Sequence, residues 1–321
     1  MGMADTVTKE YIRSNEVFAD AFNYLIYDGE QVVKPALLQE LDTTEIAIPF
    51  ALGENENQTE DVVQKYRDVL KSAVIMQDSR ASYILLGVEN QTEIHYAMPV
   101  RNIIYDALQY GKQVSEVAKR HKSKGDRKGH NKGEYLSGFY KEDRIRPVIT
   151  LVVHFGADEW DGPLSLYEMM DLEDKKLLEF VQDYRIFLID PYKLANNDLE
   201  KFSTSLGDVL GYIKYSKDKK ALSKFLNDNQ VMIMDNDAAR VIRDVTNTPI
   251  YVTDGKGEID MCKAVRDMID ESKQEGMAAG ELNKAKKMAL KMYKKGDSIE
   301  EIAEMAEVSV DQVKEWINSA V

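Results

Sequence analysis

The chain has 321 residues, of which 44% are apolar and 31% are charged, and its formal net charge is −14 at pH 7. This composition is typical of a soluble globular protein with one substantial core and a smaller appendage, and it excludes disorder throughout. The acidic balance argues against a protein that coats nucleic acid, because such binding comes from many Lys and Arg contacts to phosphate. A local basic groove remains compatible with it.

The sequence gives no sign of targeting, membrane insertion or zinc binding. The first ten residues lack the apolar stretch of a signal peptide, and no segment approaches the length of a membrane-spanning helix, so we expect a cytoplasmic protein without a membrane partner. A single cysteine, Cys262, cannot form an intramolecular disulfide, and the four histidines are scattered. Any bound metal is therefore expected to be held by oxygen.

The first predicted element is an amphipathic helix over residues 14–28, with Ser14 as its cap and Gly29 as its stop. Its apolar stripe consists of Phe18, Phe22, Leu25 and Ile26. Its polar side is expected to carry Glu16, Asp20 and Asn23. A strand or extended segment over 37–50 and an acidic loop over 53–61 are expected to follow.

Residues 62–76 fit two interpretations, a helix by apolar spacing or, from residue 69 onward, a strand that leads into a turn at 77–80. Periodicity does not decide between them. The apolar, β-favouring run at 83–91 predicts a buried strand. An apolar stripe behind Pro99 predicts a second amphipathic helix over 96–121.

Two more buried strands are predicted, at 147–155 and within 184–191. Because helices and β-runs alternate up to this point, the sequence indicates a mixed α/β core. Beyond Lys193 the β signal fades and helical patterns dominate. We therefore divide the chain into an α/β domain, a helical extension and a helical tail, at residues 1–195, 196–255 and 256–321.

The tail is expected to end in a helix, a turn and a helix over residues 298–319. Acidic side chains surround this pair, and phosphates would be repelled by such a face. Contact with protein, including self-association into a homo-oligomer, is therefore expected there rather than reading of a DNA groove.

Glu89 and Gln91 stand two residues apart at the end of the strand predicted over 83–91, so their side chains lie on one face. A carboxylate at the end of a core strand loses hydration and needs a partner, such as a cation or a hydrogen-bond network. The alternative is that Glu89 emerges into water where the strand ends. Other residues must decide between a metal site and a solvated charge.

Asp68 precedes Glu89 by about twenty residues, and this order resembles the PD-(D/E)XK nuclease superfamily. The chain more closely resembles the bacterial Rpn family of recombination-promoting nucleases and putative transposases. This resemblance covers about residues 15–195. The residues that carry it are Phe18-Ala-Asp-Ala-Phe-Asn23, Arg67-Asp68, Leu86-Gly-Val-Glu-Asn-Gln-Thr92, Tyr96-Ala-Met-Pro-Val-Arg101, Tyr105-Asp-Ala-Leu-Gln-Tyr110, Trp160-Asp-Gly-Pro163 and Ser165-Leu166.

The resemblance implies an α/β fold with a restriction-endonuclease-like core, in which helices flank a mixed sheet, and a C-terminal helical region. It implies Mg²⁺-dependent hydrolysis of DNA phosphodiester bonds, with Mn²⁺ as a substitute, in recombination or mobile DNA of bacteria. Asp68 and Glu89 would then hold the cation, with the backbone carbonyl of Asn90 and the Glu16 carboxylate as further ligands. Gln91 stands where the superfamily usually has Lys, and its amide can orient an attacking water.

Arg101 is the candidate hydrogen-bond donor to a DNA phosphate, because a guanidinium makes bidentate phosphate contacts. The alternative is an ion pair with Asp106 or Glu93. The basic stretch over 112–132 is expected to be a loop that contacts the DNA backbone, with a merely solvated loop as the alternative. The residues expected to contact DNA there are Lys119, Arg120, Lys122, Lys124, Arg127 and Lys128.

Two rival functions are also compatible with the sequence. The first is a nuclease-derived scaffold that binds nucleic acid or protein but no longer cuts, because Gln91 cannot act as a cationic stabiliser. The second is a regulatory module whose helical tail carries the function.

Overall fold

The computed structural model describes residues 2–42, 44–45, 65–66, 68–77, 80–124, 131–229, 231–253, 255 and 257–319. The chain forms two compact units. The larger unit comprises residues 1–248 with 252–259, and the smaller one comprises residues 249–251 with 260–321. None of the helices in the described part of the chain has an apolar stretch long enough to span a bilayer.

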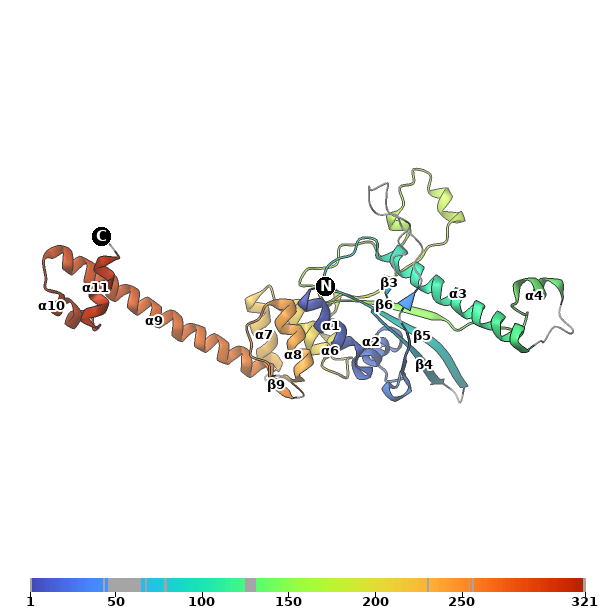
Figure 1. The fold of residues 1–321 in the computed structure, drawn as a ribbon, viewed down its shortest axis with the longest axis horizontal. Helices are drawn as coiled ribbons and strands as arrows, with labels where there is room; N and C mark the ends of the chain where they lie inside the picture. The colour runs from blue at the N-terminus through green and yellow to red at the C-terminus, as the bar shows by residue number, and fades with distance from the viewer. Residues whose placement is uncertain are drawn as a thin grey trace. The chain divides into compact units, whose positions relative to one another are not determined.

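A five-stranded mixed sheet forms the centre of the larger unit (Figure 1). Its order is β1-β4-β5-β6-β7, with antiparallel pairing from β1 to β5 and parallel pairing from β5 to β7. The mixed α/β fold predicted from the sequence is therefore confirmed. The strands are β1 (Gln39–Glu40), β4 (Val69–Gln77), β5 (Arg80–Gln91), β6 (Val148–His154) and β7 (Phe187–Ile189), and the small pairs are β2 (Thr44–Glu45) with β3 (Lys65–Tyr66) and β8 (Ile233–Asp235) with β9 (Glu258–Asp260).

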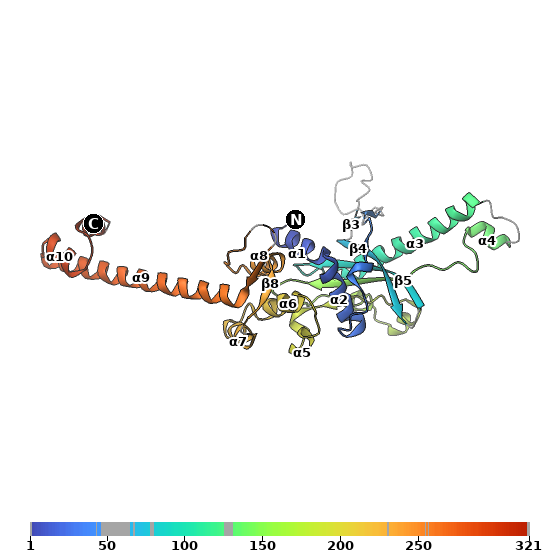
Figure 2. The same ribbon diagram turned by 90° about the horizontal axis from the view of Figure 1, so that it is seen from below.

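Helices cover both faces of this sheet (Figures 1 and 2). The helices α1 (Met3–Arg13) and α2 (Asn15–Tyr27) pack on one face, where the buried Lys71 of β4 bonds the carbonyl of Arg13 at 2.6 Å and the Oδ1 of Asn15 at 2.5 Å. Because side chains alternate along a strand, Leu70 faces the other side. There it packs with Leu85, Val148 and Tyr110 of α3 (Met98–Lys124).

Residues 138–147 run back along the C-terminal half of α3, and Figures 1 and 2 show α4 (Lys132–Ser137) beside the end of that helix. His121 stacks on Tyr140 with ring centroids 3.7 Å apart and contacts Asp143 through Nε2 at 2.8 Å. Burial would raise the pKa of Asp143, but hydrogen bonds from the Tyr140 amide and from His121 hold that pKa below its usual value. The basic end of α3 is thus tied to a defined segment.

A buried carboxylate joins α2 to the helices that follow the sheet. Asp20 accepts hydrogen bonds from the amide and hydroxyl groups of Ser203 and Thr204, at 2.6–3.0 Å, just before α6. These helices are α5 (Asn196–Leu199), α6 (Leu206–Tyr215), α7 (Lys219–Asn229) and α8 (Asn236–Thr246), and the 3₁₀ turns of the unit are η1 (Pro35–Leu37), η2 (Tyr167–Met169), η3 (Lys175–Phe180) and η4 (Pro191–Lys193).

The smaller unit contains α9 (Met261–Lys295), α10 (Ile299–Met305) and α11 (Val310–Asn318). Ile302, Val313 and Trp316 pack with Ala289 in its core. Ser298 and Ser309 cap the last two helices through hydrogen bonds to backbone amides. The predicted final helix, turn and helix are therefore confirmed as local structure.

Most predicted elements of the larger unit are confirmed, including the helix that begins after Ser14, the helix with Pro99 in its first turn and the strand over 83–91. Of the two interpretations of residues 62–76, the strand from residue 69 is confirmed, and it extends over Val69–Gln77. The helix predicted over 96–121 continues to Lys124, so the basic loop expected over 112–132 is wrong for residues 112–124. Asp20 and Asn23, expected on or near the polar side of their helix, are buried. The extended segment expected at 46–50 and the acidic loop expected at 53–61 lie outside the described residues.

We predict that Asp20→Ala lowers the free energy of unfolding by about 3 kcal/mol, because the four amide and hydroxyl donors of Ser203 and Thr204 lose their buried acceptor. Denaturant titration measures this change. Asp237→Ala is the matched control, since its carboxylate is 69% exposed and pairs with Arg240 three residues away, so it should cost less than about 1 kcal/mol. Equal effects of the two substitutions would show that Asp20 does not hold α2 to α6.

Candidate functional site

The register of β4 and β5 brings Asp68 next to Glu89. Val69 pairs with Val88, so the next position on each strand places these two carboxylates opposite each other on one face. The Glu89 side chain is 0% exposed, and the Asp68 side chain is 12% exposed. Asp68 also accepts a 2.9 Å hydrogen bond from the amide of Asn90 through Oδ2. The two acids predicted to hold a cation are thus neighbours.

Each carboxylate is paired with a cation from a different helix. Nη2 of Arg101, in the first turn of α3, lies 2.9 Å from Oε2 of Glu89. Nζ of Lys9, on α1, lies 3.2 Å from Oδ1 of Asp68. Burial would lower the pKa of Arg101, but the charges of Glu89 and, more weakly, Asp68 help to raise it above its usual value.

Arg101 therefore pairs with Glu89, and neither Asp106 nor Glu93 is its partner. Asp106 instead accepts hydrogen bonds from the hydroxyls of Thr150 at 2.6 Å and Tyr184 at 2.7 Å. These bonds connect α3 to β6 and to the segment before β7. They fix the rotation of the helix that carries Arg101.

Tyr105 lies one helical turn beyond Arg101, whose guanidinium is 5.7 Å from the centre of its ring. Burial and, next, the charge of Glu89 raise the pKa of Tyr105 to about 12, although Arg101 acts in the opposite direction. This hydroxyl is a neutral donor at physiological pH. It belongs to the same electrostatic group as the two carboxylates.

Gln91 and Asn90 complete the end of β5. The Gln91 Nε2 donates to the Asn90 carbonyl at 2.8 Å, the carbonyl that the family resemblance assigns as a ligand. The Asn90 Nδ2 donates to the hydroxyl of Thr8 on α1 at 2.6 Å. The Asn90 Oδ1 is buried and accepts no hydrogen bond from the described residues.

A cavity of about 220 Å³ opens at this strand end. Its lining includes Lys9 and Arg101, which reach it from opposite faces of the sheet, whereas Glu89, the partner of Arg101, is fully buried and does not line it. The complete lining is Asp5, Lys9, Asp68, Asn90, Gln91, Thr92, Glu93 and Arg101. The cavity therefore combines carboxylate, amide and cationic groups.

Asp68 and Glu89 offer carboxylate oxygens, the ligands that Mg²⁺ prefers. Within the described parts of the chain, no three or more His, Cys, Asp or Glu side chains form a group that could hold a metal ion. Mg²⁺, however, keeps several waters and is commonly bound through one or two carboxylates and substrate phosphates. The neighbouring Asp68 and Glu89, both hard oxygen donors, fit that mode and do not fit a cage built entirely from protein groups.

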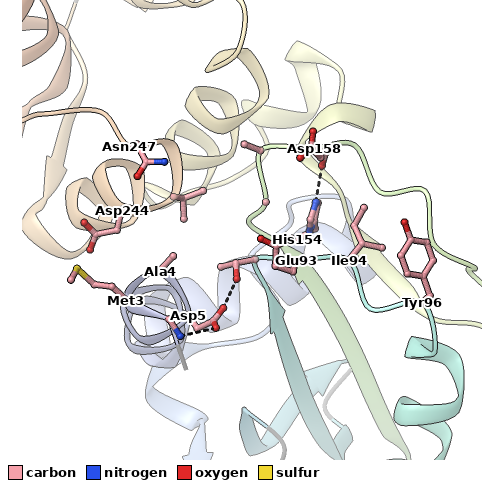
Figure 3. A pocket seen from close by; sticks show the side chains of 15 residues that line it. Met3, Ala4, Asp5, Glu93, Ile94, Tyr96, His154, Asp158, Asp244 and Asn247 are labelled. Carbon is pink, nitrogen blue, oxygen red and sulfur yellow. Dashed lines mark hydrogen bonds between the residues drawn. The ribbon is translucent and has the colours of Figure 1, made fainter.

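A second pocket, of about 580 Å³, adjoins the first and shares Asp5, Thr92 and Glu93 with it (Figure 3). The Thr92 hydroxyl donates to Asp5. Figure 3 shows His154 bonded to the carbonyl of Asp158, and Asp244 and Asn247 on the opposite wall. The carboxylates that line this pocket are Asp5, Glu93, Asp158 and Asp244. Such a lining repels phosphates, so an anionic substrate must approach the strand end from another side.

The remaining predicted site residues do not gather at this cavity. Glu16 is exposed in the first turn of α2, where its carboxylate accepts a 3.4 Å hydrogen bond from Ser14, and it does not line the cavity. The exposed side chains of Lys119, Arg120, Lys122 and Lys124 begin about 27 Å along α3 from Arg101, at 1.5 Å per residue. Arg127 and Lys128 lie outside the described residues.

The residue that sequence reasoning missed is Lys9. The signal was available, because Thr8, Tyr11 and Ile12 are buried at the spacing of a helical stripe. That stripe predicts an N-terminal helix with Lys9 beside it. It does not predict that this helix would reach Asp68.

The family model described as "Putative transposase, YhgA-like" matches residues 54–240. The chain belongs to this family. The YhgA-like family is the Rpn group that the sequence motifs resemble, which gives the chain an association with mobile DNA. The matched region contains Asp68, Glu89, Gln91 and Arg101 and continues past β7 into α8. Neither the curated proteins nor the solved structures contain a match to this chain.

We predict that Glu89→Gln lowers the pKa of Tyr105 from about 12 partway towards 10, because it removes the negative charge that disfavours the tyrosinate but leaves the ring buried. Ultraviolet titration of each protein, with its Tyr105→Phe counterpart subtracted, isolates this one phenol. Glu93→Gln, which removes an exposed carboxylate nearby, serves as the control. An unchanged Tyr105 pKa in Glu89→Gln would contradict the geometry described for this site.

Proposed function

We propose that this YhgA-like protein is a Mg²⁺-dependent DNA endonuclease that hydrolyses phosphodiester bonds in the recombination or movement of DNA. The observation that carries the proposal is the pair of Asp68 and Glu89 at one strand end, with a cation from a separate helix on each. The membership in a transposase family supports the choice of DNA as substrate.

Hydrolysis of a phosphodiester needs a group that neutralises charge and activates water. A phosphodiester is anionic and has a poor leaving group, and Mg²⁺ supplies polarisation of the phosphoryl oxygen and acidification of water. Asp68 and Glu89 would hold it, and the carbonyl of Asn90, the residue after Glu89, would be a further ligand. The Gln91 amide nitrogen donates to that carbonyl at 2.8 Å, which leaves the Gln91 side-chain oxygen to accept a hydrogen bond from an attacking water and so to orient it.

Lys9 is proposed to supply the positive charge that Gln91 lacks. Its Nζ lines the cavity and lies 3.2 Å from Asp68, so a phosphate bound beside Asp68 would be within its reach. Arg101 contributes a second cation from the opposite face of the sheet. Both are positioned by folding and not by the substrate, which is the arrangement expected for stabilising developing charge.

One observation favours a rival function. Both carboxylates are already neutralised by protein cations, which is also what a scaffold that no longer cuts would need in order to keep buried acids stable. Such a scaffold would bind DNA or protein without cleavage. The substitutions below distinguish the two functions.

The decisive experiment is incubation of supercoiled plasmid with purified protein and Mg²⁺. We expect nicking or linearisation that falls roughly 100-fold or more in Asp68→Asn and in Glu89→Gln, because each removes a cation-holding charge. Asp237→Asn on α8 is the control and should cut at the wild-type rate. Cleavage that survives both site substitutions would exclude this site, and a wild-type protein that never cuts would favour the scaffold.

Lys9→Met tests the proposed cation. We expect the turnover rate to fall about 10-fold to 100-fold with DNA binding little changed, because Lys9 would act on charge that develops during the reaction. Lys9→Arg should recover part of the rate. Lys219→Met on α7 is the control, and equal rates in Lys9→Met and wild type would remove Lys9 from the mechanism.

A further inference from the structure

A third cavity, of about 490 Å³, lies between α3 and the segment that runs back along it. Its apolar lining consists of Leu41, Leu70, Leu85 and Val117. Four cationic side chains line it, and they are Lys112, Arg120, Arg144 and Arg146, against the two carboxylates of Asp42 and Glu116. The chain as a whole carries a net charge of −14, so a cavity whose lining has more cationic than acidic side chains is a local exception.

The structure holds the two arginines of the returning segment in place. The Gln113 side chain of α3 makes two hydrogen bonds with the backbone of Arg146. Its Nε2 donates to the Arg146 carbonyl at 3.1 Å, and its Oε1 accepts from the Arg146 amide at 2.7 Å. The Arg146 guanidinium lies 5.5 Å from the centre of the Tyr83 ring. Arg144 donates through Nη1 to the carbonyls of Lys141 and Asp143 at 2.8 and 2.7 Å. The guanidinium groups of Arg144 and Arg146 are therefore preorganised, which reduces the conformational entropy that they would lose when a ligand binds.

Most of this charge is not neutralised internally. Across the described ranges of the chain, Lys112, Arg144 and Arg146 form no ion pair. Arg120 approaches Asp143 only to 3.9 Å, and its side chain is 57% exposed. Like charges gathered in this way repel one another unless an anion joins them. The cavity is thus complementary to an anionic ligand.

The position of the cavity connects it to the candidate site. Leu70 and Leu85 belong to β4 and β5, two residues from Asp68 and four residues from Glu89, and they lie on the same face of the sheet. At about 3.3 Å per residue, the cavity lies roughly 13 Å from Glu89 along β5. That distance is on the scale of a few nucleotides of a duplex, whose rise along the helix axis is about 3.4 Å per nucleotide.

We propose that this cavity binds a backbone phosphate of DNA a few nucleotides from the bond that is cut. The choice of DNA rests on the proposed function, whereas the preference for a phosphate rests on the four cations. Guanidinium groups bind phosphate oxygens in pairs, and contacts of this kind position a duplex without reading its sequence. The acidic pocket on the other side of the site would exclude DNA from that direction.

The test measures DNA binding in the absence of cleavage. Wild type and the double variant Arg144→Gln/Arg146→Gln are titrated into a fluorescein-labelled duplex without divalent cations, over a range of salt concentrations. We expect about 10-fold weaker binding and a salt slope that is smaller by about 1, which corresponds to one lost phosphate contact. The control Lys219→Gln/Lys220→Gln, on α7, removes the same charge elsewhere and should stay within about 2-fold of wild type.

Equal affinity and slope in wild type and Arg144→Gln/Arg146→Gln would overturn the inference, as would a wild-type protein that does not bind the duplex. Lys112→Gln alters only an exposed helix position, so it provides the same test if the double variant fails to fold. Because no cleavage is involved, a protein that binds through this cavity but does not cut would refute the proposed function alone.

A second arm distinguishes DNA from a small phosphate ligand. Inorganic phosphate and a mononucleotide are each added during thermal unfolding of wild type and the double variant. We expect no stabilisation at concentrations far above the duplex dissociation constant. Stabilisation of wild type alone, with unchanged duplex binding in the variant, would reassign the cavity to a free phosphate compound and overturn the DNA assignment.

Discussion

The antiparallel register between β4 and β5 is the constraint on which the candidate site depends. It pairs Val69 with Val88, and in consequence it places Asp68 against Glu89 at a strand end. A slip of one residue would turn one of the two carboxylates to the opposite face of the sheet. The register is strongly specified because both faces are covered, with Lys71 held under α1 and α2 and Leu70 packed under α3. The apolar core therefore sets the spacing of the polar site.

Two buried acids in one place carry an electrostatic cost, and the fold offsets it with cations from both faces. Arg101 is oriented by α3, whose rotation is fixed through Asp106, Thr150 and Tyr184. Lys9 is oriented by α1, which is connected to β5 through the bond between Asn90 and Thr8. Removing either cation would leave a carboxylate poorly compensated, so stability and the candidate chemistry draw on the same four side chains.

Local pattern in the sequence is sufficient to predict the elements that carry their own apolar signal. The strand over 83–91 and the helix behind Pro99 have such a signal, and the period of two places Glu89 and Gln91 on one face. The last turns of α3 are mostly exposed and rich in Lys and Arg, which is why a basic loop was expected over 112–132 although the helical pattern continued to residue 121. Lys9 is 59 residues from Asp68 in sequence, so its place in the site follows only from the packing of α1 on the sheet.

The claim that Asp68 and Glu89 together hold a divalent cation can be measured without any substrate. Calorimetric titration with Mn²⁺ should give saturable binding to the wild-type protein and to Asp237→Asn, and a loss of at least about 10-fold in affinity in both Asp68→Asn and Glu89→Gln. Mn²⁺ binding that is equally strong in all four proteins would contradict the assignment of this site.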